Sequence, residues 1–238
     1  MPVMSELSIY LAHKSPTAGS DDIRTPFSDL GMHQYSDDQL GELFAGKTVL
    51  DVGSGFEGIA RRLFHIFGNL PNAPAVTNLN PQFTDWRYDT VHDADGRRHT
   101  IKRSKQDDIE AAIREAMERY GEDQKQYFAQ RIARPGLVQE LPFLEESFHI
   151  VTSTWGFPTC MYDCGGGYNH DLTNGYIEIQ RVMKAAGGIA LLAPIRGCHI
   201  QHAERMLKEA LAENVSYDLR PTDASSSSDT FLLQLTKA

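Results

Sequence analysis

The residues best suited to acid–base chemistry lie together in one short stretch of the chain, residues 155–170. His170, Asp163 and Tyr168 have side chains of the kinds that take up and release protons in enzymes. Three consecutive glycines at 165–167 give the same stretch the backbone freedom to close over a substrate. We therefore expect these three side chains to be the candidate general bases of a catalytic loop, although a histidine here could also simply cap the helix that follows.

The same stretch raises the question of a metal. Cys160 and Cys164 with His170, or His199 with His202, could suggest zinc. Neither spacing is that of a structural zinc site, and the sequence offers no clear fourth ligand. We expect no metal.

A second stretch that could do chemistry is the glycine turn in residues 47–58, Lys-Thr-Val-Leu-Asp-Val-Gly-Ser-Gly-Phe-Glu-Gly. An apolar strand leads to Asp51, and Gly53 and Gly55 then remove the side chains that would block a cofactor. A pyrophosphate at the start of the following helix would face the carboxylate of Glu57. An NAD-dependent oxidoreductase is therefore disfavoured, whereas a cationic sulfonium ligand would not be repelled.

Two further segments follow the glycine turn in order. Residues 138–151 contain a Leu-Pro-Phe turn and then Ser-Phe-His before a β-rich run, and residues 177–192 contain Arg-Val-Met-Lys-Ala-Ala-Gly-Gly before an apolar run. Together with the glycine turn, these segments resemble the motifs of the class I S-adenosylmethionine-dependent methyltransferases. The resemblance covers residues 46–238 and is closest to the branch that methylates small metabolites and quinones.

This resemblance implies a fold, a cofactor and a set of site residues. The implied fold is α/β and Rossmann-like, with a mostly parallel seven-stranded sheet, helices on both faces and an antiparallel C-terminal hairpin strand. The implied reaction is methyl transfer from S-adenosylmethionine to a small-molecule acceptor. By motif position, the cofactor-binding residues are Asp51, Gly53, Ser54, Gly55, Asn80, Gln139, Glu140, Thr154 and Trp155.

Two positions depart from the family pattern. Asn80 stands where the family generally has an acid that accepts hydrogen bonds from both ribose hydroxyls. Leu137 or Val138 stands where an aspartate often contacts the adenine amino group, so that this contact must come from Gln139, from the backbone or from no group at all. Losing a charge-assisted hydrogen bond costs about 1.5–3 kcal/mol. The alternative function is therefore a non-catalytic methyltransferase-like domain that acts through a protein partner.

Hydrophobic periodicity predicts the elements that must position these residues. Parallel strands are expected at 49–52, 75–80, 149–153 and 188–194, with their carboxyl ends at the sheet edge where α/β folds bind ligands. Helices are expected at 36–44, 59–67, 172–183 and 203–212. A closing antiparallel pair is expected at 215–219 and 230–235.

The predicted organisation is an N-terminal cap or irregular segment, residues 1–46, and a methyltransferase-like domain, residues 47–238. Residues 81–135 are much longer than a usual connection between strands. They are expected to form an insertion with a hairpin or loop at 85–105 and a helix at 107–120. This insertion would pack on the sheet or on the second subunit of a homodimer, or else act as a substrate lid.

Composition limits the location and the partners. The chain has 238 residues, a net charge of −9 and three cysteines. An odd, small number of cysteines favours a reducing, cytoplasmic setting over a disulfide framework. The acidic balance argues against a nucleic-acid substrate, and no apolar run is long enough for a membrane span.

Overall fold

The computed structural model of the chain describes residues 30, 32, 35–53, 59, 63, 66–67, 71–80, 86–92, 98–104, 132–135, 137–154, 156–159, 169–222 and 229–238. At residues 80, 86–92, 98–104, 132–135 and 169–171 only the backbone is described. The helix predicted at 107–120 and most of the helix predicted at 59–67 lie outside these ranges.

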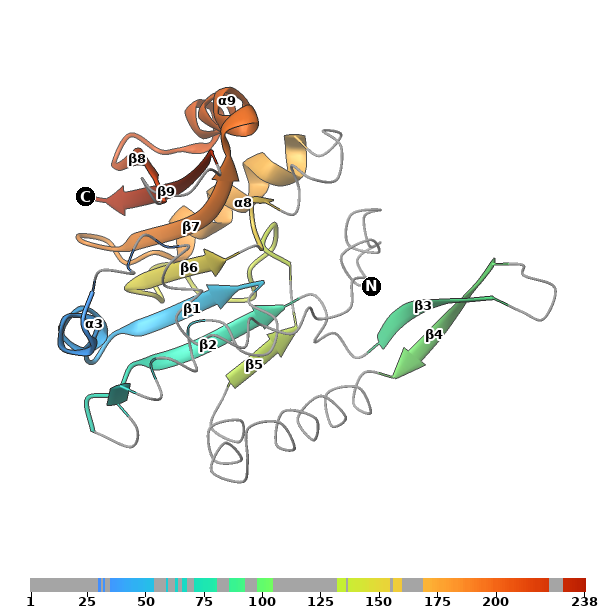
Figure 1. Ribbon diagram of the computed structural model, residues 1–238, viewed down its shortest axis with the longest axis horizontal. Helices are drawn as coiled ribbons and strands as arrows, with labels where there is room; N and C mark the ends of the chain where they lie inside the picture. The colour runs from blue at the N-terminus through green and yellow to red at the C-terminus, as the bar shows by residue number, and fades with distance from the viewer. Residues whose placement is uncertain are drawn as a thin grey trace.

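A seven-stranded sheet with the order β5-β2-β1-β6-β7-β9-β8 forms the centre of the molecule (Figure 1). The strands are β1 (Thr48–Val52), β2 (Ala75–Asn80), β5 (Ile132–Pro135), β6 (Ile150–Thr154), β7 (Ile189–Arg196), β8 (Val215–Pro221) and β9 (Thr230–Lys237). The strands from β5 to β7 pair in parallel, and β9 is antiparallel to both of its neighbours. The predicted α/β fold is confirmed, and the parallel strands bring their carboxyl ends to one edge, where such sheets bind ligands.

Helices cover both faces of this sheet (Figure 1). The described helices are α3 (Asp37–Phe44), α8 (Asn169–Val182) and α9 (Ile200–Ala210), with a 3-10 turn η2 (Gly197–His199) ahead of α9. None of them is long and apolar enough to cross a membrane. Both α8 and α9 begin three residues before their predicted starts, because their first turns, Asn-His-Asp and Ile-Gln-His, are mostly polar and weaken the apolar period.

The two faces have separate cores, and β1 contributes to both. Leu50 and Val52 pack in the cluster formed with α8 and α9. Val49 packs in the opposite cluster with α3. Successive side chains of a strand point to opposite faces, so a parallel strand covered on both sides reads as a continuous apolar run. This explains why residues 49–52 carry Val-Leu-Asp-Val with the single acid fully buried.

Helix α3 begins one residue after its predicted start, because Ser36 is its capping residue. The Ser36 Oγ accepts the Gln39 N–H at 3.3 Å, and the Gln39 Oε1 accepts the Ser36 N–H at 2.9 Å. This reciprocal capping box satisfies two backbone donors at the start of the helix. Leu30 and Met32 are buried in the same core as α3, so this part of the N-terminal segment packs against the domain.

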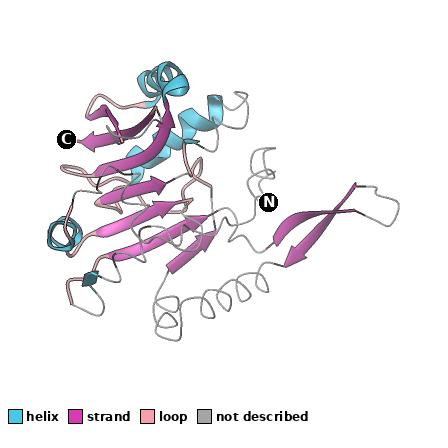
Figure 2. Ribbon diagram, viewed as in Figure 1, coloured by secondary structure: helices cyan, strands magenta, loops and turns pink. Residues whose placement is uncertain are grey.

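Strands β3 (Trp86–His92) and β4 (Arg98–Ser104) pair as a separate antiparallel hairpin. A hairpin was one of the two forms expected for residues 85–105. Figure 2 shows it standing away from the seven-stranded sheet, on the side toward which β2 points.

His149 joins β1 to β6 at their amino-terminal ends, far along both strands from the carboxyl edge. Its Nδ1 accepts the Thr48 N–H at 3.1 Å and lies 2.8 Å from the Thr48 Oγ1. Burial, and then the charges of Lys47 and Lys184, lower the pKa of His149 below its ordinary value. Protonation would place an N–H at Nδ1 opposite the Thr48 N–H and remove this hydrogen bond.

Acid should therefore destabilise the fold through His149. Because the folded-state pKa is the lower one, the contribution of the neutral ring is complete above about pH 6.5 and is lost as the pH falls through the folded-state pKa. His149→Asn keeps an acceptor oxygen but does not titrate in this range. In urea unfolding at about pH 7.5 and 5.5, the wild type should lose more stability than the variant, by up to about 1.4 kcal/mol per unit of pKa lowering. Equal losses would contradict this role.

Candidate functional site

The carboxylate of Asp51 ties together the segments around the glycine turn. Asp51 is fully buried in β1. Its Oδ1 accepts the hydroxyl hydrogen of Thr152 at 2.9 Å, and its Oδ2 accepts the Ile59 N–H at 3.1 Å. One bond fixes β1 to β6 and the other fixes the residue that follows the turn. Asp51 thus links the end of β1 both to β6 and to Ile59.

The backbones after β1 and β6 touch each other at Gly53 and Gly156. Gly53 has φ +70°, and a Cβ added to it would lie 3.0 Å from the Gly156 Cα. A Cβ added to Gly156 would lie 2.8 Å from the Val52 carbonyl oxygen and 2.7 Å from the Ser153 Oγ. The Ser153 hydroxyl donates to that same carbonyl at 2.7 Å. Glycine is required at both positions because backbone fills the space that a side chain would need.

The loop after β6 is anchored on its far side as well. Phe157 is buried, packs against Gly175 of α8 and makes an edge-to-face contact with Tyr176 at 4.9 Å between ring centroids. The Thr159 hydroxyl donates to the Pro194 carbonyl of β7. Residues 156–159 are therefore part of the core, and they hold the end of β6 in place.

Gly156→Ala should lower the free energy of unfolding by about 1–3 kcal/mol, since the new methyl group meets backbone that cannot move aside. Gly41→Ala is the matched control. The Cβ added there would meet only the Ile66 Cγ2 at 3.8 Å, and Gly41 lies inside α3, where alanine is favoured by about 0.5–1 kcal/mol. Denaturant unfolding of both variants tests the contact. Equal stability of the two would show that the loops separate without cost.

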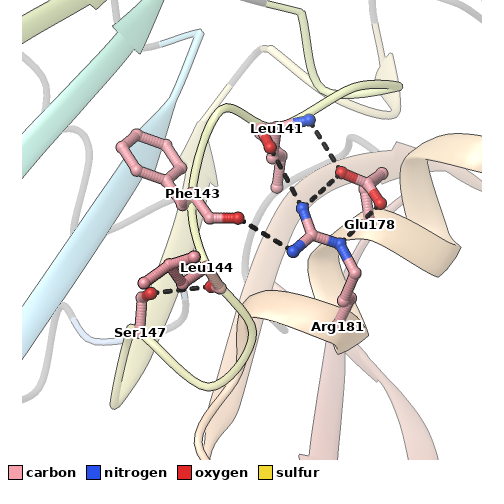
Figure 3. A network of polar contacts seen from close by, with 6 residues as sticks. All are labelled: Leu141, Phe143, Leu144, Ser147, Glu178 and Arg181. Carbon is pink, nitrogen blue, oxygen red and sulfur yellow. Dashed lines mark hydrogen bonds and ion pairs between the residues drawn. The ribbon is translucent and has the colours of Figure 1, made fainter.

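The turn between β5 and β6 is clamped to α8 by two charged residues (Figure 3). Arg181 donates from Nη1 to the Phe143 carbonyl at 2.8 Å and from Nη2 to the Leu141 carbonyl at 3.0 Å. The Glu178 Oε2 accepts the Leu141 N–H at 2.8 Å. Arg181 and Glu178 also form a bidentate pair with both N···O distances 2.7 Å. The Leu-Pro-Phe turn is thus held at three backbone groups.

The charges of this pair reinforce each other. Burial opposes ionisation of Glu178, but hydrogen bonds from Arg181 and from the Leu141 N–H outweigh it, so the pKa of Glu178 is lowered. The hydrogen bond to Glu178 raises the pKa of Arg181. Both groups are therefore charged at neutral pH, and charge-assisted hydrogen bonds are about twice as strong as neutral ones.

Two side chains near the carboxyl edge have buried polar atoms without a hydrogen-bond partner in the described part of the chain. They are Gln139, through both Oε1 and Nε2, and Thr154, through Oγ1. Thr154 is the last residue of β6 and is 9% exposed. Leaving a buried polar group unpaired costs about 1–3 kcal/mol. Such groups are uncommon, and they are the natural place to look for a missing ligand.

The other predicted site residues are described in part or not at all. Asn80 is the last residue of β2, where it pairs with Pro135, and His170 is the second residue of α8. The side chains of both are outside the description. Glu140 is exposed and bridges to Leu137. Ser54, Gly55, Trp155, Asp163 and Tyr168 lie outside the described residues.

No group of three or more potential metal ligands occurs among the described residues. His199 and His202 belong to this part of the chain. Cys160, Cys164 and the side chain of His170 lie outside it.

Comparison with solved structures identifies the architecture. The chain is similar to a putative S-adenosyl-L-methionine-dependent methyltransferase from Methanococcus maripaludis, with TM-score 0.53 and 13% identity over 92% of this chain and 89% of that one. It is also similar to the [4+2]-cyclase SpnF, with TM-score 0.51 and 14% identity over 95% and 97%. No family model and no curated protein matches the chain. The chain has the class I methyltransferase fold.

The class I methyltransferase fold does not by itself fix the reaction. One of these two neighbours is a putative methyltransferase and the other is a cyclase. Folds of this kind host several chemistries, so function has to be argued from the site.

Sequence analysis did not predict the residues that hold the strand ends and the Leu-Pro-Phe turn of the candidate site in place. They are Thr152 and Ser153 on β6, Gly156 after it, and the Glu178–Arg181 pair on α8. A partial signal was present for the pair, because Glu and Arg three residues apart on a helix form an ion pair. No sequence signal predicted the hydrogen bonds of Glu178 and Arg181 to the Leu-Pro-Phe turn.

Proposed function

We propose that the chain binds S-adenosylmethionine at the carboxyl edge of β1 and β6 and transfers its methyl group to a small-molecule acceptor. The observation that carries the proposal is the pair of unpartnered buried groups, the Gln139 amide and the Thr154 hydroxyl. They belong to the turn after β5 and to the end of β6, on either side of β1 and β2 in the strand order. A nucleoside with a polar tail would supply hydrogen-bond partners to both the Gln139 amide and the Thr154 hydroxyl.

The chemistry of the available groups fits this cofactor. The Gln139 amide offers a donor and an acceptor to the adenine. The glycine turn at Gly53, with Ser54 and Gly55, offers backbone to the ribose and methionine parts. Thr154 and Trp155 would lie at the methyl end, and Asn80 and Glu140 would contact the ribose and adenine sides.

When bound, the cofactor supplies an electrophilic methyl group on a positively charged sulfur. The chain's own task is to hold the acceptor in line and exclude water, which can account for much of the rate in a displacement. His170, Asp163 and Tyr168 are the proposed bases for the acceptor proton. The net charge of −9 supports a small acceptor over a nucleic acid.

A labelled-methyl assay tests the proposed reaction. The full chain is incubated with S-adenosylmethionine carrying an isotopic methyl label and with a panel of small oxygen, nitrogen, carbon and sulfur acceptors. Appearance of label in an acceptor, lost in His170→Ala, supports catalysis with His170 as the base. Tight cofactor binding with no transfer to any acceptor would instead favour the non-catalytic domain that acts through a protein partner.

A further inference from the structure

The Gln139 side chain is held in a fixed turn with nothing to bond to. Both amide atoms are buried and make no hydrogen bond within the described residues. The turn is closed by the bridge between Leu137 and Glu140, and Val138 and Leu141 on either side are buried. Leu141 is in turn clamped by α8. The position of this amide is therefore set by the core.

An amide presents chemistry that a carboxylate does not. Its oxygen accepts and its nitrogen donates, side by side, whereas an ionised carboxylate only accepts. The base-pairing edge of adenine carries an amino donor at C6 beside an acceptor at N1. Glutamine can match such a donor–acceptor pair with two parallel hydrogen bonds, as it does with the amino group and N7 on the opposite edge of adenine in DNA. Leu137, two residues earlier, offers the base no polar group.

We infer that Gln139 recognises the base-pairing edge of the nucleoside base, at N1 and the C6 substituent, and that it binds both adenine and hypoxanthine there. Hypoxanthine has an oxygen acceptor at C6 and an N–H donor at N1, the reverse of adenine. A half-turn of the amide about its last bond exchanges Oε1 and Nε2 and matches the reversed pattern. A carboxylate at 139 could do neither, because it only accepts and would set its second oxygen against N1 of adenine or against the C6 oxygen of hypoxanthine. This inference rests on the proposed function and specifies the base selectivity of the same site.

Calorimetric titration of the full chain with S-adenosylhomocysteine and S-inosylhomocysteine tests the inference without any turnover. The wild type should bind the two ligands within about threefold of each other. Gln139→Glu and Gln139→Leu should each weaken both ligands by about tenfold or more, because neither side chain can donate to one atom of the base and accept from the other. Gln201→Leu, at an exposed position of α9, is the matched control and should bind both ligands as the wild type does.

The outcomes separate this inference from the proposed function. If the wild type binds S-adenosylhomocysteine but rejects the inosine form by more than about tenfold, or if Gln139→Leu binds both as the wild type does, the base-reading role is wrong and the site stands. If neither the wild type nor Gln201→Leu binds S-adenosylhomocysteine, the proposed function fails and the inference fails with it.

Discussion

Arg181→Ala should lower the free energy of unfolding by about 2–4 kcal/mol. Removing one partner of a fully buried ion pair costs about 3–5 kcal/mol, and this value is discounted here because the Arg181 and Glu178 side chains are 27% and 17% exposed. The variant leaves the Phe143 carbonyl without its Arg181 donor, the Leu141 carbonyl with only the Phe143 N–H, and the Glu178 carboxylate with only the Leu141 N–H. Denaturant unfolding near pH 7 measures the loss.

An exposed ion pair of similar length provides the control. Arg220 lies 2.6 Å from Asp218, with side chains 55% and 57% exposed. Solvent screens such pairs, and Arg220→Ala should cost less than about 1 kcal/mol. The lowered pKa of Glu178 also sets a pH window, since the clamp's contribution is present above about pH 4.5 and is lost as the pH falls through the folded-state pKa. If the two arginine variants were equally stable, the two bonds from Arg181 to backbone carbonyls and its pair with Glu178 would carry no net stability.

Asp51→Ala should affect stability and ligand binding together. The Ile59 N–H loses its acceptor inside the core and the Thr152 hydroxyl keeps only the Leu50 carbonyl at 3.5 Å. Each poorly paired donor costs about 1–3 kcal/mol, so the free energy of unfolding should fall by about 2–4 kcal/mol. The turn also loses its tether at Ile59. Affinity for S-adenosylhomocysteine should then fall by about tenfold or more. Denaturant unfolding and calorimetry measure the two effects.

Asp51→Asn separates geometry from charge. Its amide oxygen can accept the Ile59 N–H while its nitrogen donates to the Thr152 Oγ1, so both contacts survive in a neutral group. We expect this variant to keep most of the stability and affinity. If it lost as much as the alanine variant, the negative charge would be the important property of Asp51, and unchanged binding in the alanine variant would contradict its role in shaping the turn.

The elements of the fold could be predicted because their signals are local. Ser36 and the acidic turn after it indicate the start of helix α3, and the apolar run before Gly53 indicates strand β1. The places of Gly53 and Thr154 at the ends of β1 and β6 could be predicted in the same way. These assignments need only the neighbouring residues and the period of their side chains.

The support for the site could not be predicted because it joins distant parts of the chain. Thr152 and Asp51 are 101 residues apart, and Arg181 reaches back 40 residues to Leu141. Gly156 follows β6 with no motif of its own, and its need for glycine comes entirely from the backbone of β1. Such contacts depend on which strands lie side by side, which periodicity does not specify.

The most direct test of the proposed site is a calorimetric titration of the full wild-type chain with S-adenosylhomocysteine, run beside Asp51→Ala. Binding to the wild type with one-to-one stoichiometry and micromolar affinity, weakened by about tenfold or more in the variant, is the expected result. An absence of heat, together with no thermal stabilisation of the wild type at millimolar ligand, would contradict a cofactor site at the carboxyl edge of β1 and β6.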